Sequence, residues 1–453
     1  MKEKTFTRRQ FLKISGISFV FFSFSNLFSL SKSPLSNRRP NFIIIMADDL
    51  GYGDLGCYGN QWISTPNLDK MAEQGMKFTD YHSNGAVCTP TRAALLTGRY
   101  QQRCGLEGVI YAKGETRQCG MPLEEITFAE VLKSAGYHTG IFGKWHLGYQ
   151  VKYNPLEQGF EEFRGYVSGN VDYHSHVDGA GYRDWWHNRE QVVEEGYTTD
   201  LITQHAVEFI KKHQDEPFCL YVAHEAPHFP FQGRHDPPDR LPGGKFPAHG
   251  SRKDSKNAYK EMIMALDESV GQVISIVKEL GIEKDTFIFF CSDNGAILKV
   301  GSNGNLRGAK GSLWEGGHRV PAIAYWPGKI KSGSVCEETV LSMDLFPTMV
   351  SIAGIKPPSN LKFDGVDISP LLFKNQKLPE RTLFWRYRKH KVARRGPWKL
   401  LIEDSKKFLF NLEKDISEKV NLADEHPEIV AQLEKQLSEW EVEVSKGVKF
   451  LTR

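Results

Sequence analysis

Four short apolar runs constrain the fold most strongly, because each has the length of a strand and is apolar on both of its faces. They span residues 41–46, 139–142, 218–223 and 286–291. Amphipathic helical patterns separate them, at residues 67–75, 127–135, 199–213 and 258–280. This alternation predicts an α/β domain with a doubly wound, mostly parallel central sheet flanked by helices.

The 453-residue chain is long enough for this large domain and a smaller one. We expect the catalytic α/β domain to span residues 38–372 and a small C-terminal α+β subdomain to span residues 373–453. Within the subdomain, the sequence predicts strands at residues 382–388, 390–402 and 407–412, and a helix at residues 427–444. These elements indicate an antiparallel sheet that carries a C-terminal helix.

Residues 1–37 have the pattern of an export signal. T-R-R-Q-F-L-K at residues 7–13 precedes a run from Ile14 to Leu30 that is too short and too serine-rich for a membrane span. The paired arginines resemble a twin-arginine signal, which the export machinery reads. An ordinary secretory peptide or an N-terminal anchor is the alternative. We therefore expect a bacterial protein exported to the periplasm or cell envelope.

Charge and cysteine content narrow the class of protein. The formal charge is +3, but the leader holds six cations and one acidic residue, so the remainder is near neutral at −2. This balance gives no reason to expect nucleic-acid binding. The seven cysteines are an odd number, which requires at least one unpaired or altered side chain. Cys219 and Cys291 lie inside apolar runs and are expected as buried thiols, and no disulfide is predicted.

Polar side chains follow each of the four predicted strands. They are Asp48 and Asp49, then Lys144 and His146, then His224 and His228, then Asp293 and Asn294. One such pair could be a helix cap or a turn. Four pairs together predict a site, because ligands of open α/β sheets bind beyond the carboxyl ends of the strands. His224 has an equally good reading as a packing residue and is not assigned to the site.

The acidic and amide side chains of this group suit a metal ion. Asp48, Asp49, Asp293 and Asn294 offer oxygen ligands, which hard divalent cations such as calcium or magnesium prefer. Zinc is disfavoured, because neither H-E-x-x-H nor paired C-x-x-C occurs. Calcium tolerates irregular oxygen coordination better than magnesium. One calcium ion per chain is therefore expected.

The stretch C-T-P-T-R at residues 88–92 predicts a helix start, with Pro90 in the first turn. Cys88 then lies at the positive end of the helix, where anions are stabilised. Arg92, one turn later, can approach it. The alternative is that Cys88 is an ordinary small, buried thiol without a catalytic role. The position suits a nucleophile that meets an anionic substrate.

Several longer stretches carry a resemblance to a known family. They are A-D-D-L-G-Y-G-D-L-G-C-Y-G (47–59), C-T-P-T-R-A-A-L-L-T-G-R (88–99), G-K-W-H-L-G (143–148), A-P-H (226–228), S-D-N-G (292–295) and L-R-G-A-K-G-S-L-W-E-G-G (306–317). With these motifs the chain resembles the type I sulfatases, the arylsulfatase A-like, formylglycine-dependent family of the alkaline phosphatase superfamily. The resemblance covers essentially the whole chain after residue 38.

The resemblance implies an alkaline-phosphatase-like fold and a sulfuric ester hydrolase. It implies that a formylglycine-generating or maturase enzyme oxidises Cys88 to formylglycine, whose hydrate attacks sulfur. Asp48, Asp49, Asp293, Asn294 and the modified Cys88 are implied to hold the cation. Arg92 is implied to stabilise the ionised hydrate, Lys144 and Lys310 to bind the sulfate, His228 to act as general acid and His146 as general base.

The substrate is less constrained by the sequence. A sulfated oligosaccharide or polysaccharide is expected, with galactose or N-acetylgalactosamine sulfate favoured. The alternatives are a phosphoesterase or phosphonate hydrolase of the same superfamily, or a non-catalytic binder of sulfated glycans if Cys88 stays unmodified. Residues 173–176 and 183–186 could form the pocket rim or a packed loop. Cationic residues 386–395 could hold further sulfates or form a solvated hairpin.

Overall fold

The computed structural model describes residues 38–452. The predicted export signal at residues 1–37 lies outside the described residues. From Arg39 onward the chain forms one compact unit. Among the helices of residues 38–452, none has both the length and the apolar content that crossing a membrane requires.

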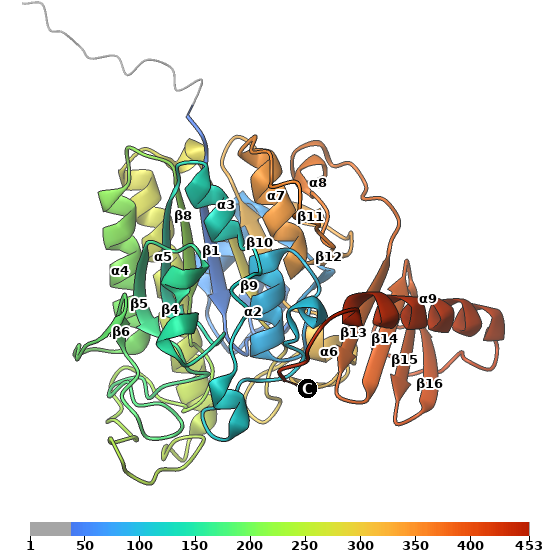
Figure 1. Ribbon diagram of the computed structural model, residues 1–453, viewed down its shortest axis with the longest axis horizontal. Helices are drawn as coiled ribbons and strands as arrows, with labels where there is room; N and C mark the ends of the chain where they lie inside the picture. Colours follow the sequence, from blue (N-terminus) through green and yellow to red (C-terminus); the bar gives the residue numbers. More distant parts are fainter. Residues whose placement is uncertain (1–37, 453) are drawn as a thin grey trace, which may run out of the picture. The chain divides into compact units, whose positions relative to one another are not determined.

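A large mixed sheet forms the centre of the molecule (Figure 1). Its middle strands are parallel, in the order β9 (Thr286–Ser292), β1 (Asn41–Ala47), β8 (Phe218–Ala223), β4 (His138–Lys144) and β5 (Glu162–Tyr166). Shorter strands extend both edges: β10 (Ala322–Tyr325), β2 (Met76–Phe78) and β11 (Ser334–Cys336) beside β9, and β6 (Trp186–His187) and β7 (Glu190–Gln191) beside β5. The predicted doubly wound, mostly parallel sheet is confirmed.

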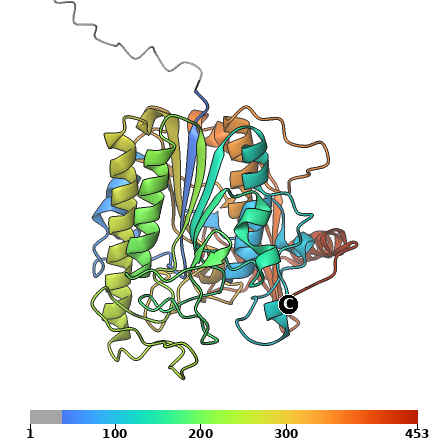
Figure 2. The ribbon, with the colours of Figure 1, turned by 60° about the vertical axis from the view of Figure 1, so that its left-hand side comes forward.

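Helices cover both faces of this sheet (Figures 1 and 2). One face packs against α1 (Pro66–Gln74), α4 (Thr198–Lys212) and α5 (Ser255–Glu279). The other packs against α2 (Cys88–Thr97), α3 (Phe128–Ser134) and α7 (Leu345–Ile352). Side chains of β1 alternate between the two cores, with Ile43 and Ile45 in one and Phe42 and Ile44 in the other. Burial on both faces explains why the strand is apolar throughout.

A smaller antiparallel sheet follows, as predicted, and α9 (Pro427–Ser445) packs on it (Figure 1). Its strands are β13 (Thr382–Tyr387), β14 (His390–Arg395), β15 (Trp398–Glu403) and β16 (Lys406–Asn411). The single strand predicted at residues 390–402 is wrong. Gly396 has a φ of 54° and precedes Pro397, so the chain turns back there and Arg395 pairs with Trp398. The domain division at residue 372 stays a prediction.

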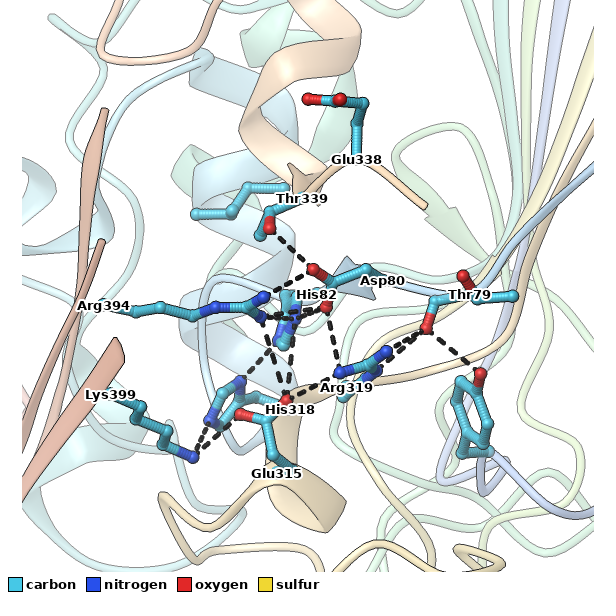
Figure 3. Close-up of polar contacts among 12 residues, drawn as sticks. Thr79, Asp80, His82, Glu315, His318, Arg319, Glu338, Thr339, Arg394 and Lys399 are labelled. Atoms are coloured by element: carbon cyan, nitrogen blue, oxygen red, sulfur yellow. Dashed lines mark hydrogen bonds and ion pairs between the residues drawn. The ribbon is translucent and has the colours of Figure 1, made fainter. Parts of the chain in front are cut away.

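Buried charges join the two sheets (Figure 3). Arg394 of β14 donates to Asp80 at 2.6 Å, and Arg319 lies 3.1 Å from the same carboxylate. Lys399 of β15 lies between Glu315 and Glu418, at 2.9 and 2.8 Å. The three cations face three carboxylates, so the network is balanced when its histidines are neutral. Burial lowers the pKa of His82 and His318, which favours that neutral state.

We expect Lys399→Met to lower the free energy of unfolding by about 3–5 kcal/mol, because Glu418 would then be buried without its cation, while Glu315 would keep Arg319 at 3.2 Å. Burial already raises the pKa of Glu418, and loss of Lys399 would raise it further, so the deficit should grow as pH rises through that value and shrink at acid pH, where protonation neutralises the carboxyl. Denaturant unfolding across pH measures this loss.

Lys407→Met is the matched control. Lys407 belongs to the same sheet as Lys399 and forms an exposed ion pair with Glu434 of α9 at 2.8 Å. Such a pair contributes less than about 1 kcal/mol. Equal losses in both variants would contradict the role assigned to the buried network.

Candidate active site

The polar residues predicted at the strand ends meet at one edge of the main sheet. Asp48 and Asp49 follow β1, Lys144 ends β4 and Asp293 follows β9. Lys144 Nζ lies 2.5 Å from Asp48 Oδ2, and the backbone N–H of Asp49 donates to Asp293 Oδ1 at 3.1 Å. Because β4, β8, β1 and β9 are parallel neighbours, their carboxyl ends deliver these groups to one place.

Helix α2 points its first turn into this cluster. Cys88 is its first residue, and Pro90 lies in the first turn as predicted. The fully buried Arg92 donates from Nη2 to Asp293 Oδ2 at 3.0 Å and from Nη1 to the carbonyl oxygen of Lys144 at 3.2 Å. Burial raises the pKa of the Cys88 thiol to about 12. The unmodified side chain is therefore protonated and a poor nucleophile.

A cavity of about 320 Å³ opens over Cys88. His146, His228 and Lys310 line it with Cys88, and Lys310 Nζ lies 2.8 Å from Asp49 Oδ2. Tyr387 of β13 also lines it, so the C-terminal sheet supplies part of the wall. The sequence did not predict Tyr387 as a cavity residue, because it lies in a stretch whose recognisable feature is its positive charge.

The two histidines of the cavity differ in their hydrogen bonds. His146 Nε2 donates to the carbonyl oxygen of Ile110 at 3.0 Å, which leaves Nδ1 buried and without a hydrogen-bond partner. Burial and Lys144 lower the pKa of His146, so the ring is neutral in the free site and Nδ1 has an available lone pair. His228 Nδ1 donates to the carbonyl oxygen of Phe229 at 2.7 Å, and Nε2 lies 3.6 Å from Asp49 Oδ2.

Burial, together with Lys310 and Lys144, also lowers the pKa of His228. The free site therefore favours neutral imidazole. To act as a general acid, His228 must carry a proton at Nε2, and a bound anion would favour that charged form.

Two buried oxygens test whether the cluster fits a metal ion. Asp48 Oδ1 and Asn294 Oδ1 have no hydrogen-bond partner, although both residues are fully buried. Oxygens of Asp48 and Asp49, the sulfur of Cys88 and a ring nitrogen of His228 lie within 4.8 Å of one another. Burial and the neighbouring Asp293 raise the pKa of Asp48, and a cation would restore its ionised form. The residues fit a divalent cation.

Asp293 belongs to the same cluster but already has partners for both oxygens. Burial raises its pKa, yet Arg92 and Lys144 outweigh that effect and hold the pKa below its usual value. Asp293 therefore stays ionised, which suits the ligand role expected for it.

Residues 173–176 and 184–186 are packed and do not form the rim, although Gly179 of the same loop lines the cavity. None of the described residues 173–176 and 183–186 lines the cavity over Cys88. Trp185 is buried and stacks on His176 with ring centroids 4.3 Å apart. Tyr173 donates to the carbonyl oxygen of His228 at 3.0 Å and so supports the segment that carries that histidine.

His224 also lies away from the cavity, with Nε2 at 2.9 Å from Ser269 Oγ. Most cations of the hairpin pair with carboxylates from other segments, whereas Arg388 and Lys389 are exposed and form no ion pair within the described residues. Arg386 contacts Glu107 and Glu441, and Lys391 contacts Glu441. The hairpin interpretation is confirmed by β13 and β14, and these paired side chains have little capacity left for further sulfates.

Comparison with known proteins shows which family the sequence matches. The sulfatase family model matches residues 40–355, and the model for the C-terminal region of N-sulphoglucosamine sulphohydrolase matches residues 309–443. N-acetylgalactosamine-6-sulfatase of Mus musculus is 37% identical over 377 residues, which are 77% of this chain and 69% of that protein. Arylsulfatase A of Bos taurus is 38% identical over 385 residues, 76% of this chain and 70% of that protein.

Solved structures agree. The crystal structure of Ps i-CgsB superposes with a TM-score of 0.83 at 32% identity, covering 92% of this chain and 95% of that one. The same protein in complex with k-i-k-neocarrahexaose superposes with a TM-score of 0.80 at 32% identity, covering 89% and 93%.

Because Asn294 Oδ1 is buried and has no hydrogen-bond partner, we expect it to bind the metal ion. Calcium added to chelator-treated protein should raise the thermal midpoint, because an ion that binds the folded state stabilises it. Asn294→Leu should weaken calcium binding by about 10-fold or more in calorimetry.

Asn41→Leu is the matched control. Asn41 is also buried, but it lies at the amino end of β1, whereas the proposed metal site lies at the carboxyl ends of the strands. Its calcium affinity should not change. Unaltered calcium binding by Asn294→Leu would contradict the site.

Proposed function

The chain belongs to the sulfatase family, and on that premise we propose that it hydrolyses sulfate esters of a polysaccharide with a formylglycine made from Cys88. The observation that carries the proposal is the position of Cys88. It begins a buried helix at the floor of a cavity in which Lys310 and His228 approach Asp49, a carboxylate that follows β1. A cationic floor beside carboxylates suits an anionic ester and a dication together.

Two groups would complete the site. A calcium ion held by Asp48, Asp49, Asp293, Asn294 and an oxygen of the modified Cys88 would supply Lewis-acid polarisation. Formylglycine, as its hydrate, would supply one hydroxyl that attacks sulfur and a second whose deprotonation expels sulfate. The raised pKa of the Cys88 thiol supports the modification, because the thiol itself is unsuited to attack.

The remaining residues would bind and move protons. Arg92, buried one turn after Cys88, would stabilise negative charge on the modified side chain. Lys144 and Lys310 would hold sulfate oxygens. His228 would deliver a proton from Nε2 to the leaving sugar oxygen, which is too basic to leave unaided. His146 would take a proton at Nδ1, the atom without a hydrogen-bond partner.

For the substrate, we propose a galactose or N-acetylgalactosamine sulfate. The similarity to N-acetylgalactosamine-6-sulfatase and to Ps i-CgsB, which was solved with a neocarrahexaose, supports this class. A bacterial envelope location, reached by twin-arginine export after a maturase has modified Cys88, belongs to the same proposal.

Cys88→Ala should lower sulfate-ester turnover by at least about 10³-fold, because the nucleophile is lost while the binding groups remain. Mass spectrometry of the wild-type peptide 81–99 should show the aldehyde in place of the thiol. Full turnover by Cys88→Ala, or a wild-type preference for aryl phosphate over aryl sulfate, would contradict the proposal.

The role of His228 predicts a dependence on the leaving group. His228→Ala should lower kcat/KM by about 10²–10⁴-fold for a sugar sulfate, whose alkoxide needs a proton. A nitrophenyl sulfate has a stable leaving anion and should be affected far less. Equal losses on both substrates would assign His228 to binding or folding instead.

A further inference from the structure

A second cavity adjoins the one over Cys88. It has a volume of about 440 Å³, and Asn170, Gly179 and Phe229 line both cavities. Each cavity falls within the size range of about 300–1,000 Å³ that is typical of small-molecule sites. A ligand longer than one sugar residue can therefore occupy both cavities, with its scissile sulfate over Cys88.

The walls of the second cavity are cationic. Lys113, Arg240 and Lys245 line it, and no carboxylate lies among the described residues that do so. Lys113 and Lys245 are exposed and belong to separate loops, and neither forms an ion pair within residues 38–452. Two flexible cations that face a cavity without a counter-charge favour an anionic ligand.

Arg240 gives the cavity a buried cation. Its side chain is 1% exposed, and its Nη1 and Nη2 reach only the carbonyl oxygens of Val177 and Ala248, at 3.3 and 3.4 Å. Its Nε has no hydrogen-bond partner. No carboxylate of the described residues lies within 4.0 Å of its guanidinium, although buried arginines are normally paired. Four carboxylates act on it only at longer range, those of Glu225, Asp172, Asp178 and Asp239.

Aromatic rings complete the cavity. Phe229 lines both cavities, and the Arg240 guanidinium lies 5.1 Å from the ring centroid of Phe246. Flat rings beside cations are suited to a sugar ring that carries a negative group. The cavity thus combines aromatic surface with positive charges that form no ion pair within the described residues.

We propose that this second cavity binds an anionic sugar next to the residue that loses its sulfate, so that the preferred substrate is an oligosaccharide with at least two negative groups. The proposal rests on the proposed sulfatase activity and adds a specificity site to it. The negative group is a sulfate ester or a carboxylate, which both suit lysine and arginine.

The test compares substrates in a Lys113→Gln/Lys245→Gln variant. Turnover of nitrophenyl sulfate, which occupies only the first cavity, should stay within about twofold of wild type. For a disulfated oligosaccharide, kcat/KM should fall by about 10–100-fold, mainly through KM, because hydrogen bonds to a charged group are lost. Oligosaccharides with a neighbouring sulfate, a neighbouring uronate or a neutral neighbour identify which anion is preferred.

Lys329→Gln/Lys331→Gln is the matched control. These exposed lysines follow β10, and because β10 runs antiparallel to β9, they lie beyond the amino end of β9, away from the site. This control variant should have wild-type turnover of both substrates. Equal losses on both substrates in the Lys113/Lys245 variant, or no loss on either, would overturn the proposal.

Binding to the inactive Cys88→Ala protein separates this proposal from the sulfatase activity. Calorimetry with the disulfated oligosaccharide should show the same 10–100-fold weakening when Lys113 and Lys245 are also substituted. If wild-type protein hydrolyses no sulfate ester, the proposed function fails, yet this measurement still decides whether the second cavity binds the anionic sugar.

Discussion

Charge balance at the carboxyl edge of the main sheet is the constraint on which the rest of the structure depends. The buried carboxylates are Asp48, Asp49 and Asp293, and the cations that face them are Arg92, Lys144 and Lys310. Charges of this kind are costly to bury unless they are paired and held in good geometry. The parallel strands, the helix that begins at Cys88 and the loop with Lys310 provide that geometry.

This balance also explains how the site can accept more charge. When Asp48 is ionised, as a bound cation would favour, the paired groups sum to zero and the dication leaves an excess of two positive charges. A sulfate monoester carries one negative charge and an ionised hydrate at position 88 would carry another. The free cluster, the proposed cation and the proposed reacting groups are thus electrostatically consistent.

The sequence predicted those parts of the molecule that depend on local pattern. Apolar runs and the polar groups after them identified β1, β4, β8 and β9 and the edge where they end. The break at Gly396 was missed, because the residues on both sides of it have a continuous strand pattern. Tyr387 and the second cavity were missed for another reason. They depend on contacts between segments that are far apart in the chain, which no local pattern records.

The buried network between the sheets has the same long-range character. The Glu418 side chain accepts from the backbone N–H of Glu315 at 2.7 Å, and its carbonyl oxygen accepts from Arg307 at 2.9 Å. These contacts bracket the loop that carries Lys310, so the segment between β16 and α9 helps to position one cation of the active site. Because Tyr387 forms part of the cavity wall, the ribosome must add roughly 300 residues after Cys88 before the cavity can close. Until then the wall over Cys88 is incomplete, so the proposed modifying enzyme would have that interval of synthesis in which to reach the cysteine.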